Sequence, residues 1–309
     1  MWYSFVRFWS VISAAILFAF SVIGGMFNCG TEKKYFDSLS ETQLNYYLDR
    51  AVSHFYFYSM SDRYIAASKR FVLNTGAKYI ARASTMWGMV GSDVNTIARQ
   101  AQMIADIHAS DPEIIFEACI FETVFTSVEQ IPIPAGVFIA FGLEPESRNF
   151  DYEKMIFESG NFVDHWGPGG SVPDITRTET QMFFYYRAML FIDAGFEALH
   201  MGQIHLYASA DKNLKVTTNL FNMIHGYAAE HARRGWVLVN AHTYGDIGSD
   251  GLLLFDCHSF PSRINEPEGS VAHPASEANP QQVIYGIGEL DSIYNKSKGG
   301  MTHAGWFTD

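Results

Sequence analysis

Apolar and polar positions alternate with two different periods along this chain, and the stretch Thr176–Tyr207 shows both. Met182, Tyr186 and Met189 recur at helical spacing, and a glycine stands where that helix would end. The short apolar run Phe196–Met201 follows, and polar residues come directly after it. A helix, a glycine stop and a buried strand in this order predict one unit of a parallel α/β sheet.

The same patterns predict further elements on both sides of this unit. Apolar runs bounded by turn residues predict strands at Lys78–Ser84, Glu113–Phe121, Asn161–Trp166, Trp236–Ala241, Leu252–Phe255 and Val283–Gly288. Helical spacing predicts helices at Ser40–Tyr58, Ser61–Leu73, Asp93–His108, Pro134–Phe141 and Leu214–Arg233. Strands that alternate with helices define an α/β protein.

The spacing of these strands indicates the architecture. The strands that begin at Lys78 and Glu113 lie about 35 residues apart, which suits the repeat of an eightfold barrel. The distance from the second strand to Phe196 is more than twice as long, so we expect one more unit between them. We therefore predict a TIM-barrel-like (β/α)8 catalytic domain over residues 77–309.

The carboxyl-terminal part departs from a regular barrel. The link between Trp236–Ala241 and Leu252–Phe255 is too short for a helix, so either a helix is missing or these strands pair antiparallel. Arg263–Gln282 shows no periodicity and predicts a long loop, and no final helix follows Val283–Gly288. The predicted barrel is accordingly irregular or incomplete at its carboxyl end.

The amino terminus predicts export. Arg7 precedes the uncharged apolar run Phe8–Phe27, a pattern typical of a secretory signal or a short membrane anchor. We assign residues 1–28 to this leader and residues 29–76 to a linker with helices. The expected location is secreted, periplasmic or membrane-anchored on the extracytoplasmic side, with membrane contact only through the leader.

Composition narrows the classes of partner. The 309 residues carry a net charge of −12, which argues against a nucleic-acid partner held by phosphate contacts. Hydrophobic residues make up 48% of the chain, enough for a large core. Cys29, Cys119 and Cys257 show no CxxC spacing, so neither a zinc knuckle nor a disulfide framework is indicated. Cys119 and Cys257 lie in apolar runs and are expected to be buried thiols.

Polar side chains gather where the predicted strands end. They are Arg82, Trp87, Glu122, His200, Gln203, Asn240, His242, Asp256, His258, Glu289 and Trp306. The carboxyl ends of barrel strands carry the active site, so we expect these residues to share one pocket.

Two carboxylates stand out in this set. Glu122 follows a buried strand and Asp256 follows an apolar run, and we predict them as the catalytic pair. Glycoside hydrolysis needs such a pair, one group as acid and the other as nucleophile or base. Glu117 lies inside a strand and is expected to meet a helix or an arginine, whereas Glu197 lies at the wrong strand end and is expected to be structural.

The other residues at the strand ends are predicted to bind substrate. These substrate-binding residues are Arg82, Trp87, His200, Gln203, Asn240, His242, His258, Glu289 and Trp306. Tryptophans near glycines, namely Trp87, Trp166 and Trp306, would suit as platforms for sugar rings, although plain packing explains each equally well. The expected partner is a carbohydrate or another small polar substrate.

Two other functions remain open. His200, His242 and His258 at successive strand ends, with Asp256, would also suit a metal-dependent hydrolase, because imidazole is a common metal ligand. Without an HxH or HExxH motif, hydrogen bonding to substrate is favoured, and we expect neither a metal nor another cofactor. The third possibility is a barrel that binds carbohydrate without turnover.

The order of the residues at the strand ends carries a resemblance. The segments ACIFE, FEALHMGQ, VLVNAHTYG and LLFDCHSFP, from Lys78 to the end of the chain, resemble those of secreted bacterial TIM-barrel proteins of the glycoside-hydrolase kind. The resemblance implies a barrel fold and a glycosidase-like activity, but it assigns no catalytic residue.

Overall fold

The computed structural model describes residues 39–54, 62–86, 93–241, 254–259, 263–265, 284–286 and 290–292. The chain divides into two units, Met1–Asp37 and Ser38–Asp309, and every described residue belongs to the second unit. The predicted leader therefore lies outside the described residues. Across the described ranges, no helix combines the length and the apolar character that a membrane span requires.

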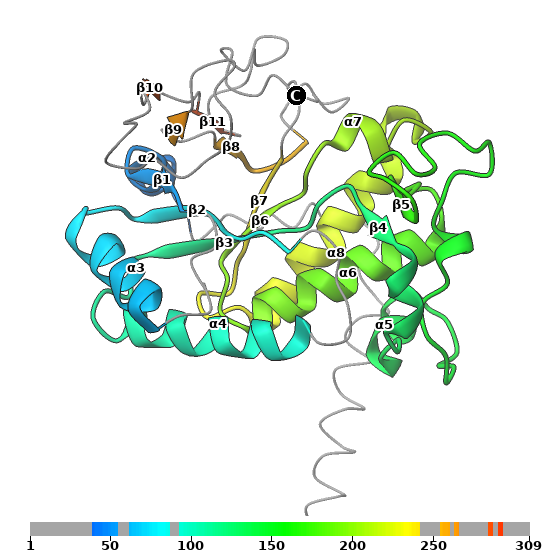
Figure 1. The fold of residues 1–309 in the computed structure, drawn as a ribbon, viewed down its shortest axis with the longest axis horizontal. Helices are drawn as coiled ribbons and strands as arrows, with labels where there is room; N and C mark the ends of the chain where they lie inside the picture. The colour runs from blue at the N-terminus through cyan, green and yellow to red at the C-terminus, as the bar shows by residue number, and fades with distance from the viewer. Residues whose placement is uncertain are drawn as a thin grey trace, which may run out of the picture. The chain divides into compact units, whose positions relative to one another are not determined.

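A five-stranded parallel sheet organises the second unit (Figure 1). Its order is β1 (Ala51–Ser53), β2 (Tyr79–Ser84), β3 (Ile115–Cys119), β6 (Ala198–His200) and β7 (Leu238–Asn240). All four neighbouring pairs within it are parallel. The predicted α/β class is confirmed, and over the described residues the sheet is not closed into a ring.

Helices connect these strands and cover one face of the sheet. They are α3 (Asp62–Asn74), α4 (Asp93–His108), α6 (Thr178–Asp193) and α8 (Lys215–His231). Figure 1 shows α4, α6 and α8 running along the same side of the sheet. Helix α6 contacts both α4 and α8, and most of its residues are buried. The helix-to-strand unit predicted from Thr176 onward is thus confirmed, with α6 at the centre of the helical layer.

The first strand corrects a prediction. The stretch Ser40–Tyr58 is not one helix, because α2 (Glu41–Leu48) ends before β1, which pairs in parallel with β2. Ser40 is the N-cap of α2, and its side-chain hydroxyl accepts a hydrogen bond from the amide of Gln43. Only three residues form β1, so it is too short to interrupt the helical pattern visibly.

The region between β3 and β6 holds the largest departure from the predicted barrel repeat. Strand β3 pairs directly with β6, so the expected extra βα unit is absent from residues 120–177, which are fully described. We call residues 120–177 the insertion. It contains β4 (Val124–Phe125), η1 (Thr126–Gln130), α5 (Ala135–Ala140), η2 (Tyr152–Lys154) and β5 (Gly170–Ser171).

The strand predicted at Asn161–Trp166 is wrong. Phe162 and Asp164 both have left-handed φ angles, of 58° and 54°, which no regular strand accommodates. The short strand of this region is β5 instead, and it pairs antiparallel with β4. The polar and glycine-rich residues around Trp166 therefore form a loop that leads into β5. The pairing of β5 with β4 brings this end of the loop close to β4.

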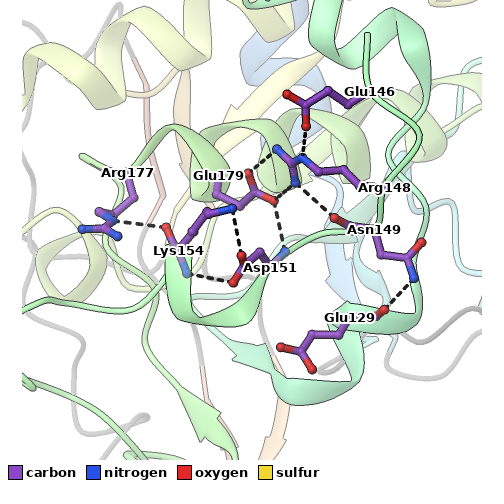
Figure 2. Close-up of polar contacts among 8 residues, drawn as sticks. All are labelled: Glu129, Glu146, Arg148, Asn149, Asp151, Lys154, Arg177 and Glu179. Carbon is purple, nitrogen blue, oxygen red and sulfur yellow. Dashed lines mark hydrogen bonds and ion pairs between the residues drawn. The ribbon is translucent and has the colours of Figure 1, made fainter.

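A partly buried ion pair holds the insertion against the first turn of α6 (Figure 2). Both carboxylate oxygens of Glu179 accept hydrogen bonds from the guanidinium of Arg148, at 2.6 and 2.9 Å. One of them also accepts from the amide of Asp151. The Glu179 side chain is 5% exposed, whereas Glu146, the second partner of Arg148, is 62% exposed. Glu179 thus joins the helical layer to the insertion that borders the candidate site.

Shorter elements complete the described chain. They are α7 (Ile204–Tyr207), η3 (Lys212–Leu214), β8 (Cys257–Ser259), β9 (Arg263–Asn265), β10 (Ile284–Gly286) and β11 (Leu290–Ser292). The pairs β8–β11 and β9–β10 are antiparallel. The predicted loop Arg263–Gln282 thus begins with a strand, and the strand predicted at Val283–Gly288 is its antiparallel partner.

Candidate functional site

The two faces of the sheet differ in chemistry. Strand residues that point toward the helices are apolar and join the main core, and they include Ile80, Phe116, Ala118, Leu199 and Val239. Residues of the opposite parity share the other face, because paired positions lie on the same side. This second face, which we call the polar face, carries Tyr79, Glu117, Cys119, His200 and Asn240, and each of them is buried.

Glu117 is the centre of the polar face. It lies on β3 with no exposed surface, and one carboxylate oxygen accepts from the Tyr79 hydroxyl at 2.6 Å and from Asn240 Nδ2 at 2.8 Å. The other oxygen accepts from the amide of Arg82 at 2.9 Å. Burial raises the pKa of Glu117, while the hydrogen bonds from Tyr79, Asn240 and Arg82 oppose that rise. Three strands thus converge on one buried carboxyl group.

This finding corrects the role expected for Glu117 in part. The sequence suggested that Glu117 meets a helix or an arginine. The structure places it on the face away from the helices, where it accepts from the Tyr79 hydroxyl, the Asn240 amide and the main-chain N–H of Arg82, and the positive charge of Arg82 lowers its pKa. Arg82 itself has a left-handed φ of 52° at a register shift in β2, which turns its N–H toward the carboxylate.

Asp256 and Cys257 lie beside the outer edge of β7. Asp256 exchanges hydrogen bonds with Val239, its amide donating to the Val239 carbonyl and its carboxylate accepting from the Val239 amide. Burial raises the pKa of the Cys257 thiol well above its ordinary value, and the negative charges of Asp256 and Glu117 add to that rise. Cys257 is thus a further buried group near the polar face.

Glu122 lies beyond the end of β3 and is 2% exposed. Its two carboxylate oxygens accept from the main-chain amide and from the side-chain amide of Gln203, each at 2.8 Å. Gly202 makes this contact possible, because its φ is 67° and a Cβ there would lie 1.8 Å from a Glu122 oxygen. The predicted residues Glu122 and Gln203 are thus brought together at the carboxyl ends of neighbouring strands.

The Cys119 thiol is influenced by both glutamates. Burial raises the pKa of its thiol well above the ordinary value, and the negative charges of Glu117 and Glu122 add to that effect. Arg82 and Arg187 lower it. Both carboxylates therefore act on the same thiol at the carboxyl end of β3, with two guanidinium groups nearby. This cluster of Glu117, Cys119, Glu122 and Arg82 is what we call the candidate site.

Arg187 supports the candidate site from the helical layer. It belongs to α6, is fully buried and donates through Nη2 to the carbonyls of Met86 and Cys119, at 2.8 and 3.2 Å. These carbonyls follow β2 and end β3. Arg187 could not be singled out from the sequence, because its position on α6 did not indicate which strand ends it would reach.

Asp256 makes a different set of contacts. Its carboxylate accepts from the amide of Val239 at 2.6 Å and lies 3.1 Å from the ring of His225 on α8. His225 is buried. Asp256 thus joins the edge of β7 to the helical layer, and its pairing with Glu122 in catalysis stays a prediction.

The structure describes some of the remaining predicted site residues and not others. His200 ends β6 on the polar face, with its ring edge-on to Phe121 at 6.3 Å. Asn240 and Arg82 both donate hydrogen bonds to Glu117, as described above. The predicted residues Trp87, His242, Glu289 and Trp306 and the side chain of His258 lie outside the described residues. Their roles stay predictions.

Glu197 lies at the opposite end of the strands. It directly precedes β6 and pairs with Arg233 at 2.9 Å and Arg234 at 3.0 Å. Burial raises its pKa, and the two guanidinium groups oppose that rise. These contacts fit the structural role expected for it.

Metal binding finds no support from the part of the chain that the structure describes. Within those residues, no group of three or more His, Cys, Asp or Glu side chains is arranged to hold an ion. Two of the histidines predicted for such a site, His242 and His258, are not among the described side chains. Cys119 and Cys257 are free and buried, as the sequence suggested.

Comparisons with known proteins add no constraint. No family model matches the chain, and no curated protein or solved structure is similar enough to be matched. Function therefore has to be argued from the candidate site itself.

Proposed function

We propose that this chain is an exported glycoside hydrolase built on a TIM-barrel-like scaffold. The observation that carries the proposal is that β3 places two buried carboxyl groups near its carboxyl end, Glu117 within the strand and Glu122 three residues beyond it. Two carboxyl groups in unlike surroundings are what cleavage of a glycosidic bond requires. The apolar segment Phe8–Phe27 supports the export part of the proposal.

The two glutamates differ in a way that suits them to different steps. Glu117 is desolvated and its pKa is raised, a property that a general acid needs. Glu122 accepts N–H groups of Gln203 at both oxygens, as a nucleophile or base does before reaction. In this proposal Glu117 protonates the leaving-group oxygen, and Glu122 acts as the nucleophile or base. Glu117 thereby takes the part first given to Asp256, because burial raises the pKa of Glu117.

The parallel strands and the helices that connect them support the barrel-like scaffold. Strand order and direction agree with consecutive barrel units at β1, β2 and β3 and again at β6 and β7. Arg82, His200, Gln203 and Asn240 gather at the same edge and are proposed to bind the sugar hydroxyls.

A hydrolysis screen tests this function. The full chain is incubated with 4-nitrophenyl glycosides of glucose, galactose, mannose, xylose and N-acetylglucosamine in both anomers. We expect hydrolysis of at least one of them, unaffected by EDTA and lost in the double variant Glu117→Gln, Glu122→Gln. Activity that EDTA abolishes would favour the metal-dependent alternative. Sugar binding without hydrolysis would favour the non-catalytic one, and the absence of both would refute a carbohydrate function.

A further inference from the structure

A half-buried tryptophan lies beside the proposed reacting carboxylate. The indole N–H of Trp166 donates to the main-chain carbonyl of Glu122 at 3.2 Å. The ring packs against the hydrophobic core on one side but is not fully buried. The exposed ring of His165 stands edge-on to it, with 4.5 Å between the ring centroids. An aromatic surface is thus held at the edge of the candidate site.

The loop that carries Trp166 is fixed by its own contacts. Strand β4 follows Glu122 after one residue, and its pairing with β5 brings the loop back to this point. The amide of Trp166 donates to the carbonyl of Gly170 at 3.0 Å, and that of Gly169 to the carboxylate of Asp164 at 2.7 Å. Asp164 has a left-handed φ, a costly conformation that surrounding contacts must maintain. The indole is therefore positioned before any ligand arrives.

We propose that Trp166 is the stacking platform for a neutral pyranose ring bound next to Glu122. This inference rests on the proposed function and adds the class of sugar and the residue that selects it. The apolar face of a pyranose packs on an indole, while its hydroxyls reach polar groups at the edge, here Gln203 and His165. An anionic sugar is disfavoured, because the indole adjoins Glu122 and the chain carries a net charge of −12.

Kinetics of ring-truncated variants test the platform. Initial rates are measured with cellotetraose, xylotetraose, mannotetraose and chitotetraose for the wild type, Trp166→Ala and Trp166→Phe. Stacking of this kind corresponds to about a tenfold change in affinity, so Trp166→Ala should raise KM about tenfold with kcat nearly unchanged. Trp166→Phe loses the hydrogen bond to Glu122 but keeps a ring, so its KM should stay within about threefold of the wild type.

A second readout covers the case in which Trp166→Ala does not fold. Sugar should change the tryptophan fluorescence of the wild type and of the control Trp236→Phe, but not that of Trp166→Phe. Trp236 suits as the control because it is 5% exposed and precedes β7, with Arg234 over its ring. Hydrolysis that continues with an unchanged KM in Trp166→Ala would refute the platform and leave the proposed function standing. If the wild type hydrolyses a 4-nitrophenyl glycoside but neither binds nor cleaves any of the tetrasaccharides, the platform is refuted and the proposed function stands.

Discussion

Glu122→Gln should lower kcat by about 10³-fold while the chain still folds, because it removes a carboxylate proposed to act directly on the substrate. Glutamine keeps the size of the side chain and one acceptor oxygen for Gln203. Its NH₂ group, however, would face one of the two N–H donors that the carboxylate now accepts. We therefore expect a stability loss of about 1–2 kcal/mol in addition to the kinetic effect.

The measurement is kcat on the best 4-nitrophenyl glycoside, together with urea unfolding of both proteins. Glu129→Gln is the matched control, because Glu129 lies on the same insertion with an exposed side chain. It should change neither quantity. A Glu122→Gln variant that folds and retains kcat within about tenfold would show that Glu122 only holds Gln203 in place.

Gly202→Ala should cost at least about 3 kcal/mol of folding free energy and remove most of the activity. An alanine Cβ at this position would lie 1.8 Å from a Glu122 carboxylate oxygen and 2.9 Å from the Glu122 amide. The backbone φ of 67° is also unfavourable for any residue with a Cβ. Glu122 and the turn that follows β6 would have to move away from each other, which would break both hydrogen bonds between Glu122 and Gln203.

Urea unfolding with an unchanged m-value measures this loss. Gly136→Ala provides the comparison, because Gly136 lies in α5 with no atom within 4 Å of an added Cβ and without a positive φ. Alanine in a helix is favoured over glycine by about 1 kcal/mol, so this variant should be slightly more stable. Equal stability of Gly202→Ala and the wild type would mean that the turn and Glu122 are not packed as described.

The sequence predicted the parallel sheet where its elements are long or strongly patterned. The helix α6 and the strand after it follow from apolar spacing and a glycine stop, and the structure confirms both. Strand β1 was missed because three residues leave no period to detect. The insertion was taken for a barrel unit because its length suits one, while its short β4 and β5 carry no strand pattern of their own.

The candidate site was predicted in part. Glu122 and Gln203 were both named from their positions after strands, but their mutual contact depends on the φ of Gly202, which the sequence does not reveal. Glu117 was misread because alternation shows that two faces exist without showing which face the helices cover. The contact of Asp256 with His225 depends on how α8 packs, which no local pattern encodes.

The central claim is that Glu117 and Glu122 act as an acid and a base or nucleophile near the carboxyl end of β3. The pH dependence of kcat/KM tests it most directly, because that profile reports the groups of the free enzyme. The pKa of Glu117 is raised above 4.5 by burial, and the acid must be protonated, so activity should fall as pH rises through that raised pKa.

Glycosides with a 4-nitrophenyl leaving group need little help from an acid, so Glu117→Gln should keep measurable turnover on them. The account predicts that this variant loses the descending limb of the profile, while Asp256→Asn retains it. A descending limb that is unchanged in Glu117→Gln, or that disappears in Asp256→Asn instead, would contradict the assignment of Glu117 and return the acid role to Asp256.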